Sequence, residues 1–232
     1  ALWRDLEQKA RRVLSLYGCC EIRTPILERT TTFTRSLGDT TDVVRKEMYQ
    51  FEDQGGRSIC LRPEGTAGVV RYVAGLGPAG LESRVYYLGP MFRRERPQAG
   101  RKRQFHQLGV ELFGPANPLA DAECMALQLH LLDAWGLEGA EIQLNTRGTA
   151  EDQVAVRKGL SSLLQPHIQD LCEDCRRRIS ENVLRVMDCK QERCRAVVQA
   201  LPPMTEFMSH GGQSYFRDVL STLESMGLGV TV

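Results

Sequence analysis

The spacing of apolar residues predicts a helix at the front of the chain. Apolar side chains recur at helical intervals, with charged residues between them, at Leu6, Ala10, Val13, Leu14 and Tyr17. Gly18 is placed to end this helix. Residues 21–28 then read as one strand, in which Pro25 suits a sheet edge or a bulge. The first element is therefore a helix that leads into a sheet.

A hairpin and a second helix are expected next. Residues 48–51 and 58–61 predict two strands, and the glycine-containing stretch 53–56 predicts their turn. A short helix is expected to begin near Thr66, a residue type able to cap it. Glu64 would then lie at a corner between strand and helix.

The middle of the chain predicts a second strand pair. Residues 85–88 and 107–113 frame a polar, glycine-containing stretch, as two antiparallel strands with a long loop would. An apolar stripe over 121–135 predicts a helix, and 140–145 predicts one more strand. Composition shifts toward Arg, Glu, Gln and Cys from about residue 148, so a domain boundary is expected there.

The loop between these two strands is strongly basic. It contains a single acid, Glu95, and six basic residues. The basic residues are Arg93, Arg94, Arg96, Arg101, Lys102 and Arg103. Guanidinium groups grip phosphate oxygens through paired donors, and Gly100 lets the backbone approach a ligand. A polyphosphate site and a solvated basic hairpin tip both fit this charge pattern.

The returning strand separates two kinds of side chain by face, because strand residues alternate. One face carries Phe105, Gln107, Gly109, Glu111 and Phe113, and the other carries His106, Leu108, Val110 and Leu112. The second face predicts core. On the first, Gly109 would leave room for a ligand to lie on the sheet. Arg93 and Glu95 are expected to share a face of the preceding strand, and they would border the same ligand-binding face if the two strands pair. The alternative is a pair of solvated polar residues at Gln107 and Glu111.

Composition excludes two classes of protein. Hydrophobic residues make up 42% and charged residues 25% of the 232 residues, and no apolar run approaches the ~20 residues that cross a bilayer. No leader is visible at the front, so we expect a cytoplasmic protein with reduced thiols rather than a disulfide miniprotein. With a net charge of +1, binding of a polyanion must depend on local basic clusters.

Four cysteines near the end of the chain leave two interpretations open. Cys172 and Cys175 are separated by two residues, and Cys189 and Cys194 by four. Four thiolates of this kind can bind zinc tetrahedrally, but the second spacing is loose, and free thiols are the other interpretation. We assign no metal ligand from sequence. The adjacent run 176–178 is either an RNA contact or an exposed basic helix face.

The motifs together resemble the histidine–tRNA ligase family of class II aminoacyl-tRNA synthetases. Segment 92–107 is similar to that family's motif 2 nearly residue for residue, and 61–68 resembles its segment for the substrate amine. The stretch with Arg23, Pro25 and Glu28 resembles the dimer-forming motif 1. The resemblance implies an α+β fold, in which an antiparallel sheet flanked by helices carries a small, mostly helical insertion domain.

The resemblance also implies a role for each site residue. Arg93 would contact the α-phosphate of ATP as the catalytic residue, while Glu95 holds the adenine end, Arg101 reaches the outer phosphates and Phe105 stacks on adenine. Histidine would be held through its α-amino group by Glu64, Thr66 and Gln107, and through its imidazole by Glu111.

The implied reaction forms histidyl-adenylate and pyrophosphate from histidine and ATP, with Mg²⁺ on the phosphates, and then transfers histidine to tRNA(His). The carboxylate nucleophile is already ionised, so positioning and charge stabilisation matter more than a general base. A homodimer is also implied.

The resemblance further predicts the domain organisation. We expect a catalytic core over 1–147, a helical insertion domain over 148–227 and the start of a returning core strand over 228–232. The family's extreme N-terminus, its Arg-Gly-Leu-Asp-Tyr-Tyr segment, motif 3 and the anticodon-binding domain have no counterpart here. We therefore expect this polypeptide alone to be a weak or inactive catalyst.

Two other functions compete with this one. A non-catalytic histidine-binding regulatory subunit of ATP phosphoribosyltransferase shares the fold, but has no need of Arg93, Arg101 and Phe105 as an ATP clamp. A basic RNA-binding module with a zinc knuckle would rest only on the segment after 170. Separate titrations of ATP and histidine distinguish the three.

Overall fold

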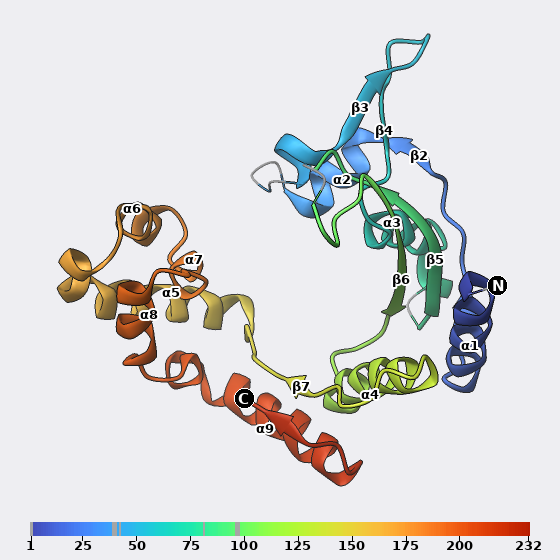
Figure 1. The fold of residues 1–232 in the computed structure, drawn as a ribbon. Coiled ribbons are helices and arrows are strands. Elements are labelled where there is room, and N and C mark those ends of the chain that lie inside the picture. Colours follow the sequence, from blue (N-terminus) through green and yellow to red (C-terminus); the bar gives the residue numbers. More distant parts are fainter. Residues whose placement is uncertain (1, 39–40, 42, 81, 96–97) are drawn as a thin grey trace. The chain divides into compact units, whose positions relative to one another are not determined.

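The computed structural model describes residues 2–38, 41, 43–80, 82–95 and 98–232. Its contacts divide the chain into two compact units, Ala1–Ala140 and Glu141–Val232, which are described separately below. Both helices and strands contribute, so the α+β prediction is confirmed (Figure 1).

In the part of unit 1 that the structure describes, six strands form two sheets. One sheet has the order β1-β5-β6, in which β1 is parallel to β5 and β5 is antiparallel to β6. The other is antiparallel, with the order β2-β4-β3. The bounds are β1 (Cys20–Glu21), β2 (Leu27–Arg29), β3 (Tyr49–Glu52), β4 (Ser58–Leu61), β5 (Arg84–Phe92) and β6 (Gln104–Leu112). The predicted hairpin and the predicted strand pair are both confirmed.

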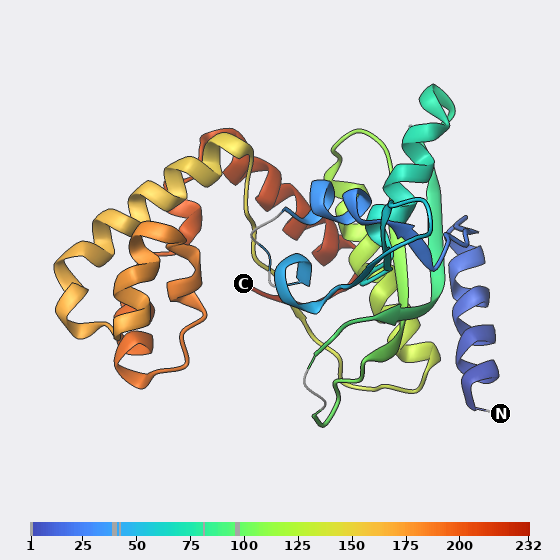
Figure 2. The ribbon, with the colours of Figure 1, turned by 90° about the horizontal axis from the view of Figure 1, so that it is seen from above.

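Helices cover both faces of the β5–β6 pair (Figures 1 and 2). Ala10 and Leu14 on one side meet Leu127 and Leu131 in a cluster that also contains Tyr86. On the opposite face, Val69 and Val73 pack with Tyr87 and Met91. The helices that supply these residues are α1 (Leu2–Leu16), α4 (Pro118–Ala134) and α3 (Thr66–Gly75).

Two further helical elements of unit 1 contribute to a third cluster. Phe33 and Met48 are buried with Cys60 and Ala67, beside the strands of the second sheet. The elements concerned are α2 (Thr30–Leu37) and the π-helical turn Val43–Glu47. The 3-10 turn Gly77–Gly80 follows α3, and Gly80 lies against Val73.

The single strand expected over 21–28 is wrong, because the chain changes sheets within it. β1 pairs with β5, whereas β2 pairs with β4. Pro25 lies between them and has no N–H to donate to a ladder. The connection is anchored instead by the Arg62 N–H, which donates to the Ile26 carbonyl (2.9 Å).

Unit 2 is mostly helical, apart from one short parallel pair. Its strands β7 (Ile142–Gln143) and β8 (Val230–Thr231) pair with each other, so the expected boundary after Arg147 falls inside this unit. Its helices are α5 (Ala150–Leu164), α6 (Glu173–Glu181), α7 (Leu184–Met187), α8 (Glu192–Gln199) and α9 (His210–Ser225), with 3-10 turns at Gln165–Asp170 and Met204–Phe207.

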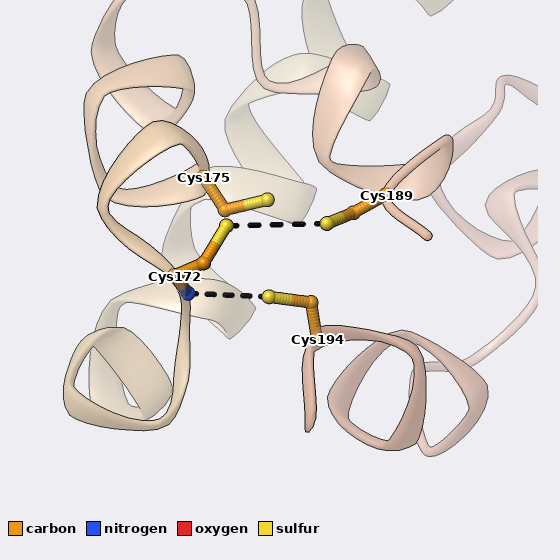
Figure 3. A group of neighbouring side chains, drawn as sticks. All are labelled: Cys172, Cys175, Cys189 and Cys194. Atoms are coloured by element: carbon orange, nitrogen blue, oxygen red, sulfur yellow. Dashed lines mark hydrogen bonds between the residues drawn. The ribbon is translucent and has the colours of Figure 1, made fainter. Parts of the chain in front are cut away.

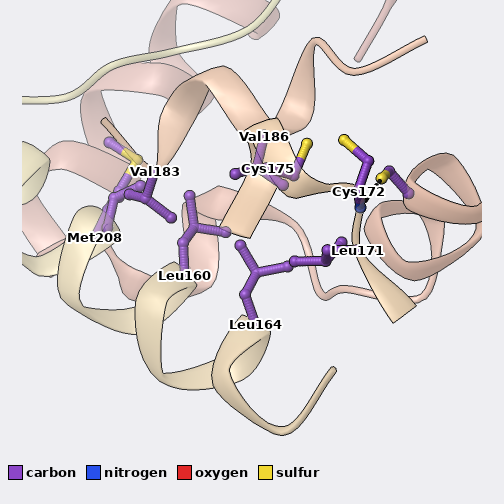
Figure 4. Packing of buried hydrophobic residues seen from close by; sticks show 10 residues of the cluster. Leu160, Leu164, Leu171, Cys172, Cys175, Val183, Val186 and Met208 are labelled. Atoms are coloured by element: carbon purple, nitrogen blue, oxygen red, sulfur yellow. Dashed lines mark hydrogen bonds between the residues drawn. The ribbon is translucent and has the colours of Figure 1, made fainter. Parts of the chain in front are cut away.

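Aliphatic side chains from several of these helices form one core (Figure 4). Leu160, Leu164 and Leu171 are fully buried with Val186, and cysteines share the same cluster. Unit 2 therefore has a hydrophobic core of its own, which contains none of the residues of the unit 1 clusters.

Candidate active site

The face of β5 and β6 that is turned toward α3 carries three of the predicted site residues, Phe105, Gln107 and Glu111. Residues directly opposite each other in an antiparallel pair share a face. The pairs here are Met91 with Phe105, Gly89 with Gln107, Tyr87 with Gly109 and Val85 with Glu111. Leu108, Val110 and Leu112 pack instead with the α1–α4 cluster. The predicted division of β6 into a core face and a polar face is therefore confirmed.

Three of the predicted histidine-binding residues lie together at one end of this face. The Glu64 carboxylate accepts hydrogen bonds from the backbone N–H groups of Thr66 and Ala67. The Thr66 hydroxyl donates to Glu111 Oε1 (2.6 Å). The expectation that Thr66 caps α3 is therefore wrong: Glu64 binds the free N–H groups of the first turn, which leaves the Thr66 hydroxyl for Glu111.

The space above Gly109 is not open, contrary to expectation. A methyl group added at Gly109 would lie 2.3 Å from Tyr87 Cζ, and one at Gly65 would lie 2.2 Å from Tyr87 Cε2. Gly109 therefore makes room for the cross-strand ring of Tyr87. The buried tyrosine ring forms part of the site wall between Gly65 and Glu111.

Burial shapes the titration of this acidic end. Loss of solvent raises the pKa of Glu111, and the negative charge of Glu64 adds to the rise, while the hydrogen bond from Thr66 opposes it. Burial likewise raises the pKa of Tyr87. A carboxylate in such surroundings gains from a hydrogen-bond donor, which is the property required to read an imidazole N–H.

Gln107 supplies an unused acceptor further along the strand. Its Oε1 atom is buried and has no hydrogen-bond partner among the described residues. Buried polar atoms are normally paired, so an orphan of this kind marks a position for a donor from a ligand. Its cross-strand neighbour Gly89 is covered by the guanidinium of Arg62, whose Nη2 lies 2.7 Å from the position of an added methyl group.

Arg93 and Phe105 meet at the other end of the face. The Arg93 guanidinium lies 5.2 Å from the centre of the Phe105 ring, and its Nε donates to the Pro63 carbonyl (2.9 Å). These two contacts hold the guanidinium in place, so its remaining N–H groups are preoriented for an anion.

Glu95 and Arg101 form an ion pair in the basic loop, with 3.3 Å between Glu95 Oε2 and Arg101 Nη1. The expectation that Arg93 and Glu95 share a strand face is wrong, since β5 ends at Phe92. The Arg93 N–H still bonds to the Arg103 carbonyl, but that of Arg94 bonds to the Glu47 carbonyl, which takes the chain away from β6. Arg96 and Pro97 lie outside the described residues.

The basic run at 176–178 in unit 2 is largely engaged by neighbouring groups. Arg176 donates to the carbonyls of Leu171 and Gln169, and Arg177 pairs with Asp174. These contacts are local, so the run lies on an ordered helix surface.

Two residues of the site were not predicted from sequence, Tyr87 and Arg62. The alternation applied to β6 would have found Tyr87 if it had also been applied to β5, because Tyr87 shares a face with Gly89 and Met91. Arg62 is 7% exposed and donates to the backbone of Thr24 and Pro90. Its burial depends on contacts between distant segments, which no local pattern indicates.

The site thus has an acidic end around Glu64 and Glu111 and a basic end around Arg93 and Arg101. Phe105 and Glu111 are six residues apart in β6, which corresponds to about 20 Å along a strand. With the motif 2 segment on this strand pair and helices on both faces, the arrangement agrees with the α+β fold that the resemblance to class II aminoacyl-tRNA synthetases implies.

Comparison with known proteins identifies the family. The family described as histidyl-tRNA synthetase matches residues 1–207. The chain is 46% identical to the histidine–tRNA ligase of Halothermothrix orenii over 235 residues, and 47% identical to that of Synechococcus elongatus over 229 residues. The chain belongs to the histidyl-tRNA synthetase family.

Solved structures agree with this assignment. The crystal structure of apo S. aureus histidyl-tRNA synthetase matches with a TM-score of 0.73 and 32% identity over 99% of the chain. A Bacillus halodurans structure titled as an ATP phosphoribosyltransferase regulatory subunit/histidyl-tRNA synthetase matches with a TM-score of 0.68 over 97% of the chain. Its identity is 21%, so this second match concerns the fold alone.

The matches cover most of this chain but only part of the relatives. They include 97% and 98% of the chain, and 54% and 53% of the two ligases. For the S. aureus structure, 52% of that chain is covered. The chain therefore spans about half the length of the relatives it matches.

Proposed function

We propose that this chain carries the ATP- and histidine-binding half of an enzyme that activates histidine to histidyl-adenylate and transfers it to tRNA(His). The observation that carries the proposal is the group formed by Glu64, Thr66 and Glu111. Glu111 lies on β6, the strand that also carries Phe105, and the Arg93 guanidinium contacts the Phe105 ring. The acidic subsite matches the ammonium and imidazole groups of histidine, and the basic subsite matches the phosphates of ATP.

The acidic end would bind histidine. Glu64, Thr66 and the orphaned Gln107 Oε1 would hold the α-amino group, and Glu111 would accept a hydrogen bond from the imidazole. The Thr66–Glu111 hydrogen bond would rearrange as histidine enters, because both groups then gain partners in the ligand. A ligand without the imidazole N–H would leave Glu111 desolvated and unpaired, which accounts for selectivity.

The basic end would bind ATP. Arg93 would stabilise charge on the α-phosphate as the histidine carboxylate attacks the phosphorus and pyrophosphate departs. Arg101 would move from Glu95 to the outer phosphates, and Glu95 would then hold the adenine end. Phe105 would stack on adenine. Mg²⁺ would be held mainly by phosphate oxygens of the nucleotide.

The wider roles follow from family membership. A homodimer, tRNA binding through residues 176–178 and a cytoplasmic location belong to the same proposal, as does the assignment of 148–227 as the insertion domain. No helix in the described part of the chain is long and apolar enough to span a membrane.

Calorimetric titration of ATP and histidine separately tests the function. We expect both to bind, and histidine-dependent exchange between ATP and pyrophosphate then measures adenylate formation. Binding of histidine without ATP would favour the regulatory subunit of ATP phosphoribosyltransferase. Binding of neither ligand would overturn the proposal.

A further inference from the structure

Four cysteine sulfurs in unit 2 converge on one point (Figure 3). The Sγ atoms of Cys172, Cys175, Cys189 and Cys194 all lie within 4.8 Å of one another. Cys172 immediately precedes α6 and Cys175 lies in its first turn, while Cys189 follows α7 and Cys194 lies in the first turn of α8. The loose spacing of the second pair in sequence therefore does not prevent the four side chains from meeting.

The spacing of the sulfurs fits a single small ion. Four thiolates bound tetrahedrally at ~2.3 Å from zinc lie about 3.8 Å from one another. The Cys172 and Cys189 sulfurs are 4.0 Å apart. A disulfide would need a separation of ~2.05 Å, so the present spacing is that of ligands around a common centre rather than of a bonded pair.

Backbone N–H groups are directed at the sulfurs. The Cys172 backbone N–H donates to Cys194 Sγ (3.2 Å), and such N–H donors orient and stabilise sulfurs that bind a metal. Two helix N-termini, those of α6 and α8, are directed at the group, and neither has a side-chain cap. Their free N–H groups place partial positive charge where four thiolates and a dication would leave a net negative charge.

Hydrophobic packing accounts for only part of this arrangement. Cys172, Cys175 and Cys194 are buried beside Leu171 and Val186, as small apolar side chains would be. Packing alone, however, does not require the sulfurs of three separate segments to face each other. It would equally allow each sulfur to contact the aliphatic core.

We propose that Cys172, Cys175, Cys189 and Cys194 bind one Zn²⁺ as four thiolates in a closed structural site. The ion would tie the short helices α6, α7 and α8 together. Helices of 9, 4 and 8 residues have little stability of their own, so a metal crosslink contributes directly to the folding of this unit. The site lies in unit 2, apart from the ATP and histidine residues of unit 1.

Metal analysis of the whole chain, purified without chelator, tests the site. We expect one zinc per chain by mass spectrometry, and a loss of at least fivefold in the Cys189→Ser variant, whose side chain is only half-buried. The matched control is Cys20→Ser, which removes an exposed cysteine from unit 1 and should leave the zinc content unchanged.

Cobalt titration of the chelated wild-type chain gives a second readout that needs no variant. A tetrahedral thiolate site produces intense visible and near-ultraviolet absorption that saturates at one Co²⁺ per chain and is reversed by Zn²⁺. The proposal is overturned if the purified chain carries iron, if it contains a disulfide among these cysteines, or if all four thiols react freely while no zinc is present.

Discussion

At the residue scale, Glu111 combines a cost to stability with its proposed role in binding histidine. Its raised pKa means that the folded protein holds the Glu111 proton more tightly than the unfolded chain does. The ionisation of Glu111 therefore lowers the free energy of unfolding as the pH rises above 4.5, the ordinary pKa of this carboxyl group. A group that destabilises the fold at neutral pH is characteristic of a site retained for ligand binding.

Replacing Glu111 with Gln should separate the two effects. We expect the Glu111→Gln variant to melt at the same or a higher temperature at pH 7, because the buried charge is gone. Histidine affinity should fall by about 10–100-fold, since a hydrogen bond to a charged acceptor contributes roughly 1.5–3 kcal/mol. Calorimetric titration and thermal melts measure both. The exposed Glu52→Gln is the control, and unchanged histidine affinity in Glu111→Gln would contradict the assignment.

Arg93 should not tolerate replacement by lysine. A single ammonium cannot keep the bond to the Pro63 carbonyl, the contact with Phe105 and a phosphate contact at once. We expect Arg93→Lys to lower ATP affinity by about tenfold or more, as a lost charged hydrogen bond implies. The control is Arg103→Lys, an exposed charge on the same loop. Equal effects of the two variants would show that only net charge matters.

At the scale of elements, the packing of Tyr87 over Gly109 stabilises the β5–β6 pair. Tyr87 lies across from Gly109 and reaches Gly65 at the start of α3, so one ring joins both strands to the helix. The same ring separates the acidic end of the site from the interior. Stability of the pair and shape of the site therefore depend on the same contact.

A methyl group at Gly109 should disrupt this packing. Tyr87 is buried and cannot move aside, so we expect Gly109→Ala to lower the free energy of unfolding by about 1–3 kcal/mol. Denaturant unfolding of the chain gives the value. Gly114→Ala is the matched control, because an added methyl group there meets no atom within 4 Å. Equal stability of the two variants would contradict the packing described.

Asp152 plays a similar connecting role in unit 2. Its carboxylate accepts hydrogen bonds from the Ser209 N–H (2.7 Å) and the Thr149 N–H (2.9 Å), and so links the starts of α5 and α9. These hydrogen bonds lower the pKa of Asp152 to about 2, and the bond from Ser209 has the largest effect.

The stabilising effect of Asp152 should therefore depend on pH. It is present above the ordinary aspartate value of about 3.9 and is lost as the pH falls toward 2. We expect Asp152→Asn to lower the melting temperature at pH 7 and to reduce the dependence of stability on pH between 4 and 2. Glu151→Gln, an exposed neighbour in the same helical turn, serves as the control. An unchanged acid profile in Asp152→Asn would disprove the link.

At the scale of the whole molecule, the two units have separate cores and carry separate sites. The proposed substrate site depends on clusters in Ala1–Ala140, and the cysteine site on a cluster in Glu141–Val232. Loss of one site should therefore leave the other intact.

Hydrogen exchange after zinc removal tests this independence. We expect peptides covering α6, α7 and α8 to exchange faster in the chelated chain, while peptides of β5 and β6 keep their protection. Histidine affinity should remain unchanged. Loss of protection in both units would show that the cores are coupled.

Local order in the sequence was enough to predict much of this protein. Apolar spacing indicated the first helix, the hairpin and both long strands, because these patterns repeat within a few residues. The alternation along β6 separated Glu111 and Gln107 from the core face correctly. The motif 2 segment was sufficient to indicate the family that the comparisons later identified.

Other features were decided by the tertiary structure alone. Tyr87 fills the space over Gly109, β1 and β2 join different sheets, and Asp152 links two helices distant in sequence. The four cysteines meet only because α6, α7 and α8 fold onto one core. The periodicity of apolar residues indicates which side of a helix or strand is buried, but not which distant segment covers that side. The covering segment is set by contacts between parts of the chain that are far apart in sequence, and no local pattern connects them.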